Sequence, residues 1–159
     1  MGISEGLPML DQIDRNILRV MQKDGRITNQ DLAAKSGISP SACFDRLRKL
    51  REQGYITDIV ALLDPEKLDR SLLVFIEVVL DRTTNNHFDE FAAVVRRMPE
   101  ILECHMVAGG FDYLLKTRVA NMAAYRRFLG DTLTLLKGVR ETRTYAVLEE
   151  VKYTTNLQI

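Results

Sequence analysis

The stretch TNQDLAAKSGISPSACFDRLRKLREQG, residues 28–54, decides the fold of the first part of this chain. Thr28 is a typical helix N-cap and Gly37 a typical C-terminal stop, so the stretch opens with a short helix. Ser39-Pro40 then begins another helix, because serine caps free amides and proline is tolerated in the first turn. Two helices separated by a short glycine-containing turn have helix-turn-helix spacing. We therefore predict a DNA-recognition helix over Ser39–Gln53, preceded by an amphipathic helix capped by Asp11.

One side of the predicted recognition helix is apolar, and the opposite side is small, polar or charged. Cys43, Leu47 and Leu50 recur at helical spacing and form the buried stripe. A helix that exposes small and charged residues in its first turns suits the major groove of DNA. We expect DNA contacts from residues in and before this helix, namely Arg26, Ser39, Ser41, Ala42, Asp45, Arg46, Arg48, Lys49 and Arg51.

These residues have different predicted roles. Arg48 can donate two hydrogen bonds to guanine, and Asp45 can accept from cytosine or orient Arg48 three residues away. Lys49 and Arg51 suit phosphates, as does Arg26 in the turn before the second helix. Arg46, although basic, lies back toward the buried stripe. The whole chain holds 22 basic and 22 acidic residues, so its affinity for DNA must come from this local cluster and not from bulk charge.

The 159 residues are enough for two small domains. We place the boundary at Asp64-Pro65, with a DNA-binding domain over 1–64 and a second domain over 65–159. Between Gly54 and this boundary, two short extended pieces can form a wing or a strand-like linker. The sequence has no apolar run near the ~20 residues of a membrane span and no secretory leader, so we expect a cytoplasmic protein without membrane partners. Its two cysteines suit reduced, buried thiols.

The second domain reads as β-α-β-β-α-β. A nearly unbroken apolar run predicts a buried strand, alternation predicts three more strands, and helical periodicity predicts two helices. The elements in order are a strand over 72–80, a loop over 81–86, a helix over 88–98, strands over 101–108 and 113–119, a helix from the Asn121 cap to Gly138, and a strand over 140–151. The fold class is α+β, with both helices on one face of an antiparallel ferredoxin-like sheet. The other face of the sheet is too apolar to remain exposed to solvent, which favours dimerisation through it.

The hairpin over 101–119 also has a predicted register. If Ala108 pairs with Tyr113 across the Gly109–Asp112 loop, Glu103 lies opposite Arg118 and forms a cross-strand ion pair. Gly109 and Gly110 have two interpretations. They can be turn glycines that tolerate positive φ, or their free amides can hold a small carboxylate.

No catalytic constellation, phosphate-binding glycine motif or metal-ligand spacing is present in the sequence, so we expect no enzyme activity, no cofactor and no metal site. His87 and His105 lie in different predicted elements. His105 is best explained as a residue of the sheet surface beside Lys116.

Several motifs resemble the Lrp/AsnC, or feast/famine, family of regulators, and the resemblance covers nearly the whole chain. The motifs are IDRNIL at 13–18, QKDGRI at 22–27, GISPSAC at 37–43, ALLDP at 61–65, GGFDYLL at 109–115 and TRTY at 142–145. The resemblance implies a winged helix-turn-helix followed by a RAM-type ferredoxin-like domain. It also implies homodimers that assemble into an octamer or related ring, and a small amino-acid effector, leucine or similar, bound between subunits.

The resemblance further implies an effector site near the hairpin and the last strand, at Gly109, Gly110, Asp112, Thr144, Tyr145 and Ala146. The glycine amides would take the effector carboxylate, and Asp112 would take its ammonium group. Two positions depart from the family pattern. Ala42 stands where the family often has a second proline, and Ala146 stands where leucine-responsive members are bulkier, so the effector preference can differ from leucine.

The function expected from these features is a sequence-specific regulator of amino-acid metabolism genes that binds double-stranded DNA and responds to a small effector. Two alternatives stay open. Subunits of siroheme decarboxylase resemble this family, although they do not need an exposed DNA-reading helix. An architectural protein that wraps DNA with modest sequence preference would show strong salt dependence with little discrimination between sites.

Overall fold

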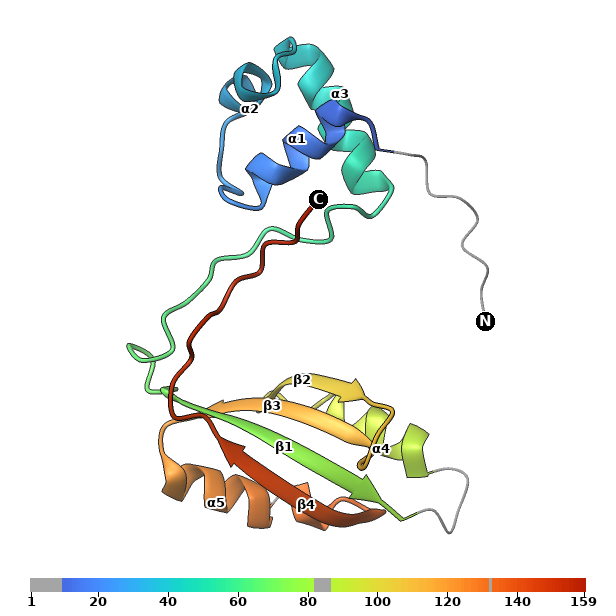
Figure 1. Cartoon of the computed structure of the whole chain (residues 1–159), viewed down its shortest axis with the longest axis vertical. Helices are drawn as coiled ribbons and strands as arrows, with labels where there is room; N and C mark the ends of the chain where they lie inside the picture. Colours follow the sequence, from blue (N-terminus) through green and yellow to red (C-terminus); the bar gives the residue numbers. More distant parts are fainter. Residues whose placement is uncertain (1–9, 82–86, 132) are drawn as a thin grey trace. The chain divides into compact units, whose positions relative to one another are not determined.

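The computed structural model describes residues 10–81, 87–131 and 133–159, and the chain divides into two compact units (Figure 1). The first unit ends at Leu62 and also contains Lys152–Ile159, whereas the second unit spans Leu63–Val151. The boundary predicted at Asp64-Pro65 lies two residues further along the chain. That prediction also placed the last eight residues in the second domain, and the structure packs them with the first.

Three helices build the first unit: α1 (Gln12–Met21), α2 (Asn29–Ser36) and α3 (Pro40–Glu52). Each begins after its predicted N-cap, whose side chain accepts a hydrogen bond from the backbone amide three residues later. Gly37 ends α2 in the left-handed region, with φ of 70°, a conformation that favours glycine. The predicted helix-turn-helix and the bounds of its recognition helix are therefore confirmed.

The core of the first unit lies where the three helices meet. Its buried members include Ile17 of α1, Leu32 of α2, and Cys43 and Leu50 of α3. Burial raises the pKa of the Cys43 thiol, which is consistent with a reduced core cysteine. Residues 53–71 are all described, and no strand is assigned in them. Within this one chain, the stretch after α3 is therefore extended and pairs with no other strand.

A C-terminal tail, Lys152–Ile159, completes the first unit. The Gln22 side-chain amide donates to the Leu157 carbonyl at 3.1 Å and accepts from the Leu157 amide at 2.5 Å. Arg19 Nε donates to the Ile159 carbonyl at 2.6 Å, and Ile159 packs against the three-helix core. The tail was not predicted because it has neither helical nor strand periodicity.

The second unit is a four-stranded antiparallel sheet in the order β2-β3-β1-β4 with two α-helices. Its elements are β1 (Leu72–Leu80), α4 (His87–Val95), β2 (Ile101–Met106), β3 (Tyr113–Val119), α5 (Met122–Asp131), a 3-10 turn (Leu133–Leu135) and β4 (Val139–Ala146). The ferredoxin-like order is confirmed. The predicted last strand was too long, since β4 ends at Ala146. The predicted loop over 81–86 falls mostly outside the described residues.

The core of the second unit lies between the sheet and its helices. Alternate residues of β1, Val74 to Leu80, are buried together with Phe91 of α4 and Tyr125 of α5. Because these β1 residues share one face of the strand, both helices cover that same face, as predicted. The Tyr125 hydroxyl lies 2.5 Å from the Thr144 hydroxyl of β4 and ties α5 to the edge of the sheet.

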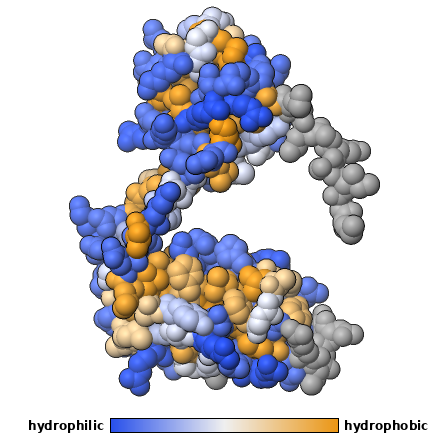
Figure 2. Space-filling view, viewed as in Figure 1, coloured by the Kyte–Doolittle hydropathy of each residue, from blue (hydrophilic) through white to orange (hydrophobic). Residues whose placement is uncertain are grey.

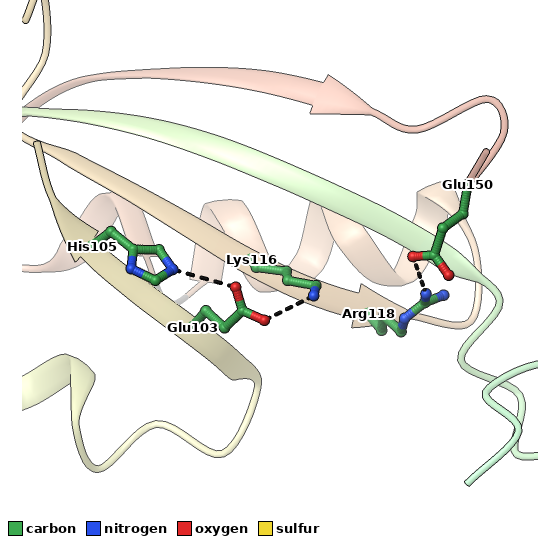
Figure 3. Close-up of polar contacts among 5 residues, drawn as sticks. All are labelled: Glu103, His105, Lys116, Arg118 and Glu150. Atoms are coloured by element: carbon green, nitrogen blue, oxygen red, sulfur yellow. Dashed lines mark hydrogen bonds and ion pairs between the residues drawn. The ribbon is translucent and has the colours of Figure 1, made fainter. Parts of the chain in front are cut away.

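The register of the β2–β3 hairpin differs from the prediction by two residues. Met106, and not Ala108, is paired with Tyr113, so Glu103 lies opposite Lys116. Lys116 Nζ donates to Glu103 at 2.8 Å, while Arg118 pairs with Glu150 at 2.7 Å (Figure 3). The predicted Glu103–Arg118 ion pair is therefore wrong. The loop is displaced by one residue toward the N-terminus, because the Val107 amide donates to the Asp112 carbonyl at 3.0 Å and so closes residues 108–111.

Candidate DNA interface and effector site

The reading face of α3 is exposed as the helical wheel predicts. Ser41, Asp45, Arg48 and Lys49 are all solvent-exposed. Arg48 is held between two carboxylates, at 3.6 Å from Asp45 and 3.3 Å from Glu52. The expectation that Asp45 orients Arg48 therefore matches the geometry. Such exposed pairs are weak, so DNA can compete for the guanidinium.

The start of α3 is organised by its cap. The Ser39 hydroxyl accepts a hydrogen bond from the Ala42 amide at 3.3 Å and lies 3.2 Å from the Ser41 hydroxyl. Pro40 occupies the first turn. Ser39 is thus engaged in capping, while Ser41 and Ala42 are exposed on the first turn and can approach a groove closely.

Arg46 does not belong to this face. Its Nη1 donates to Asp11 at 2.6 Å and to Asp14 at 2.8 Å, so the side chain bridges α3 to the start of α1. Hydrogen bonds with Asp14 and Asp11 raise the pKa of Arg46. The Asp14 amide and then Arg46 lower the pKa of the Asp11 carboxyl. Arg46, predicted as a DNA contact, joins the two helices in this structure, and its guanidinium is already satisfied by two carboxylates.

The predicted phosphate contacts lie at the edges of the same unit. Lys49 and Arg51 are exposed on α3, in the half of the helix away from its N-terminus. Arg26 is exposed in the turn before α2, where its amide donates to Asp24 at 3.0 Å. None of the three has an ion pair among the described residues. Their side chains are available for phosphate oxygens.

The hairpin glycines are not required by the fold of a single chain. Gly109 and Gly110 are exposed, and neither has a φ in the left-handed region. A Cβ built at either position would meet no heavy atom of the described residues within 4 Å. The interpretation of these glycines as turn residues with positive φ is therefore wrong. Glycine leaves open space beside the backbone at both positions.

Asp112 anchors the hairpin loop to β1 through hydrogen bonds. Its side chain is buried, and its Oδ2 accepts from the Leu80 amide at 2.8 Å. Its own amide donates to the Val78 carbonyl at 3.0 Å. These bonds join the loop to the end of β1 and shape the backbone on which Gly109 and Gly110 sit. Asp112 thus has a structural role whether or not it meets an ammonium group.

Thr144, Tyr145 and Ala146 lie in β4, on strand positions that alternate between the two faces. Tyr145 is half-exposed on the face without helices, opposite Phe75. A hydrogen bond with Glu77 raises the pKa of its phenol. Ala146 pairs with Val74, whereas Asp112 bonds at Val78 and Leu80. Four strand residues span about 13 Å. The predicted effector site thus has two halves, the hairpin residues 109–112 and the β4 residues 144–146, and these halves lie apart within one chain.

The two histidines have separate surroundings. His87 Nδ1 lies 3.0 Å from the Asp81 carbonyl, and His105 Nε2 lies 3.3 Å from Glu103 on the exposed sheet face (Figure 3). Across the described ranges, no cluster of three His, Cys, Asp or Glu residues is arranged to hold a metal ion. No helix of the described part of the chain is long and apolar enough to cross a membrane.

An exposed aromatic residue of α3 was missing from the predicted set. Phe44 is 61 % exposed, and it lies beside the reading face. Its position on the helical wheel, outside the stripe of Cys43, Leu47 and Leu50, was the available signal.

The first unit carries a capped recognition helix. The second unit is a sheet covered by helices on one face, with an exposed glycine hairpin. Together these features define a DNA-binding regulator with a ligand-binding domain. Comparison with known families agrees. The family model for the Lrp/AsnC ligand binding domain matches residues 73–157, and the winged helix-turn-helix DNA-binding model matches residues 10–57. The chain belongs to the Lrp/AsnC family of transcriptional regulators.

Individual relatives are similar over nearly the full chain. The leucine-responsive regulatory protein of Salmonella typhimurium is 55% identical over 150 residues, which are 94% of this chain and 92% of the relative. That of Escherichia coli K12 is 54% identical with the same coverage. A Neisseria meningitidis transcriptional regulator solved in complex with L-Met is 39% identical, with a TM-score of 0.91 over 94% of this chain and 97% of that chain.

Proposed function

We propose that this protein regulates genes of amino-acid metabolism in the cytoplasm, by binding double-stranded DNA at specific sequences and responding to a small amino acid, without enzyme activity. The observation that carries the proposal is the exposed reading face of α3 in a chain whose second unit matches an amino-acid regulator's ligand domain. Relatives more than half identical to it are leucine-responsive regulatory proteins.

The residues proposed to contact base edges are Ser41, Asp45 and Arg48, on the reading face of α3. Arg48 donates to guanine, and Asp45 positions it. Lys49, Arg51 and Arg26 bind phosphates, which supply affinity without sequence information. Arg46 is left out of this set, because its partners Asp11 and Asp14 hold it against α1.

The open sheet face is the proposed dimer interface. Tyr145 is 48 % exposed, and Phe75, Val79 and Leu114 are half-buried on this face. Figure 2 shows apolar residues gathered over the strands of the second unit. Burial of such a patch against a second copy is favourable by about 25 cal/mol per Å² of apolar surface. We further propose that dimers assemble into an octamer or a related ring.

The effector site is proposed to need more than one chain. Gly109 and Gly110 offer free amides and open space, whereas Thr144, Tyr145 and Ala146 pair with the stretch of β1 from Ile76 back to Val74. The two halves meet only if one subunit supplies the hairpin and another supplies β4. The hairpin amides take the carboxylate, and a buried Asp112 holds the loop in place or meets the ammonium group at its edge.

The effector is proposed to carry an apolar side chain. Relatives are named for leucine, and a similar structure contains L-Met. A thermal-shift screen of the twenty amino acids tests this directly. A ligand at 100 times its dissociation constant stabilises the protein by about 2.7 kcal/mol. A flat response to all twenty contradicts the proposal.

Glycine substitutions separate the site from the fold. Gly110→Ala should leave the melting temperature of the free protein unchanged or slightly higher, because φ is permissive and space is open. The same change should weaken the effector at least tenfold and leave DNA affinity in its absence intact. Gly130→Ala, at an exposed α5 position with equal space, is the matched control and should leave effector affinity unchanged. If Gly110→Ala binds the effector normally, the hairpin is not the site.

A further inference from the structure

Phe44 is an apolar residue in a position where α3 otherwise exposes polar groups. Its side chain is 61 % exposed, although the neighbouring Cys43 is completely buried. Phe44 is the fifth residue of α3, within the first two turns, from which a recognition helix reaches base edges. A large apolar ring at this point does not contribute to the three-helix core.

The surroundings of Phe44 suit DNA better than an apolar partner surface. Ser41 and Arg48 lie three and four residues away, and Arg51 lies seven residues away, so all three share its side of the helix. The carboxylates of Asp45 and Glu52 lie on the far side of Arg48, which they contact at 3.6 and 3.3 Å. The ring is therefore bordered by a hydroxyl and two guanidinium groups.

The chemistry of the major groove indicates which DNA group the Phe44 ring can contact. Its floor carries hydrogen-bond donors and acceptors and a single kind of apolar group, the C5-methyl of thymine. We propose that Phe44 is a specificity-determining residue that packs against a thymine methyl. It is a fixed distance from the proposed guanine contact of Arg48. Four residues of helix rise about 6 Å, which corresponds to about two base pairs at 3.4 Å each.

The test removes the methyl group from the DNA and the ring from the protein. Full-length protein first selects its binding site from a random duplex library. Each constant thymine is then replaced singly by uracil, which lacks only the methyl, and affinities are measured for wild type, Phe44→Ala and Phe44→Leu. Arg51→Ala, on the same side of α3, is the matched control for a contact that carries no methyl recognition.

For wild type, uracil at one thymine per half-site should lower affinity about fourfold, the equivalent of burying one methyl-sized group. Phe44→Ala should bind the thymine site less tightly and no longer distinguish thymine from uracil. Phe44→Leu should keep part of the preference. Arg51→Ala should weaken both duplexes equally and keep the full discrimination.

Three results would overturn the proposal. The first is continued fourfold discrimination by Phe44→Ala. The second is the absence of a constant thymine within about two base pairs of the guanine whose contribution Arg48→Ala removes. The third is a changed size of the DNA-free Phe44→Ala protein in sedimentation, which would assign the ring to a contact between copies.

Discussion

Arg46→Met tests the clamp that the structure shows between α3 and α1. Methionine keeps most of the length of the arginine side chain and its apolar packing, but it removes the guanidinium that bonds Asp11 and Asp14. Arg46 is one of four basic residues within six positions of α3, and its charge and position in the sequence predict a DNA contact. The structure predicts a loss of stability and not a loss of phosphate contacts.

The expected loss follows from exposure and geometry. The Arg46 side chain is 33% exposed and that of Asp14 20%, with a contact of 2.8 Å between Nη1 and Oδ1. Partly exposed ion pairs contribute about 1 kcal/mol or less once solvent screening is counted. A change of that size lowers the melting temperature of a small domain by about 4–8 °C. Because the pKa of Asp11 is lowered in the folded state, this stability is present above the ordinary carboxylate range and is lost as pH falls through the folded pKa.

The assay compares stability and salt-dependent DNA binding in the full chain. Thermal unfolding is followed at neutral pH and in acid, where wild type and Arg46→Met should converge. Binding to a selected duplex is then measured over a series of salt concentrations. Arg46→Met should keep the wild-type slope, while Arg51→Ala should reduce it by about 0.9, the value for one phosphate. Equal stability together with a reduced slope for Arg46→Met would refute the clamp.

Three further predictions concern other contacts. Gly138→Ala should destabilise the protein by about 1–2 kcal/mol in urea unfolding, because φ is 87° and its Cβ would meet the His87 ring at 2.9 Å; an unchanged midpoint would contradict this. Ile159→Ala should cost about 1 kcal/mol and speed hydrogen exchange in α1, since the partly buried Ile159 packs on the three-helix core; unaltered exchange would mean that the tail is not docked. Bonding to Lys116 lowers the pKa of Glu103, so stability from this pair should be lost as pH falls through the folded pKa. Glu103→Gln should flatten the acid limb of the stability profile, and NMR titration of Glu103 checks the direction.

Local chemistry made much of this protein predictable. The caps Asp11, Thr28 and Ser39 act on amides three residues away, so the sequence alone located the starts of all three helices. The apolar run Leu72–Leu80 was identified as a strand because its length and composition suit burial. The sheet faces were also predictable, since a strand alternates with a period of two.

Contacts between distant residues escaped prediction. A hairpin register can slip by two residues and keep every side chain on its proper face, so the pattern alone did not distinguish Arg118 from Lys116 as the partner of Glu103. Asp112 fixes the register of the hairpin, because its hydrogen bonds to Val78 and Leu80 shape the loop. Arg46 turned toward α1 because two carboxylates 32 and 35 residues away lay within reach.

The sequence by itself determined that a recognition helix and a ferredoxin-like sheet are present, because periodicity and capping act over a few residues. Only the tertiary structure decided which basic side chains on α3 are available to DNA. It also showed the two halves of the proposed effector site apart within one chain, and the tail on α1. Each of these depends on how elements far apart in the chain pack together, and no short-range pattern encodes that arrangement.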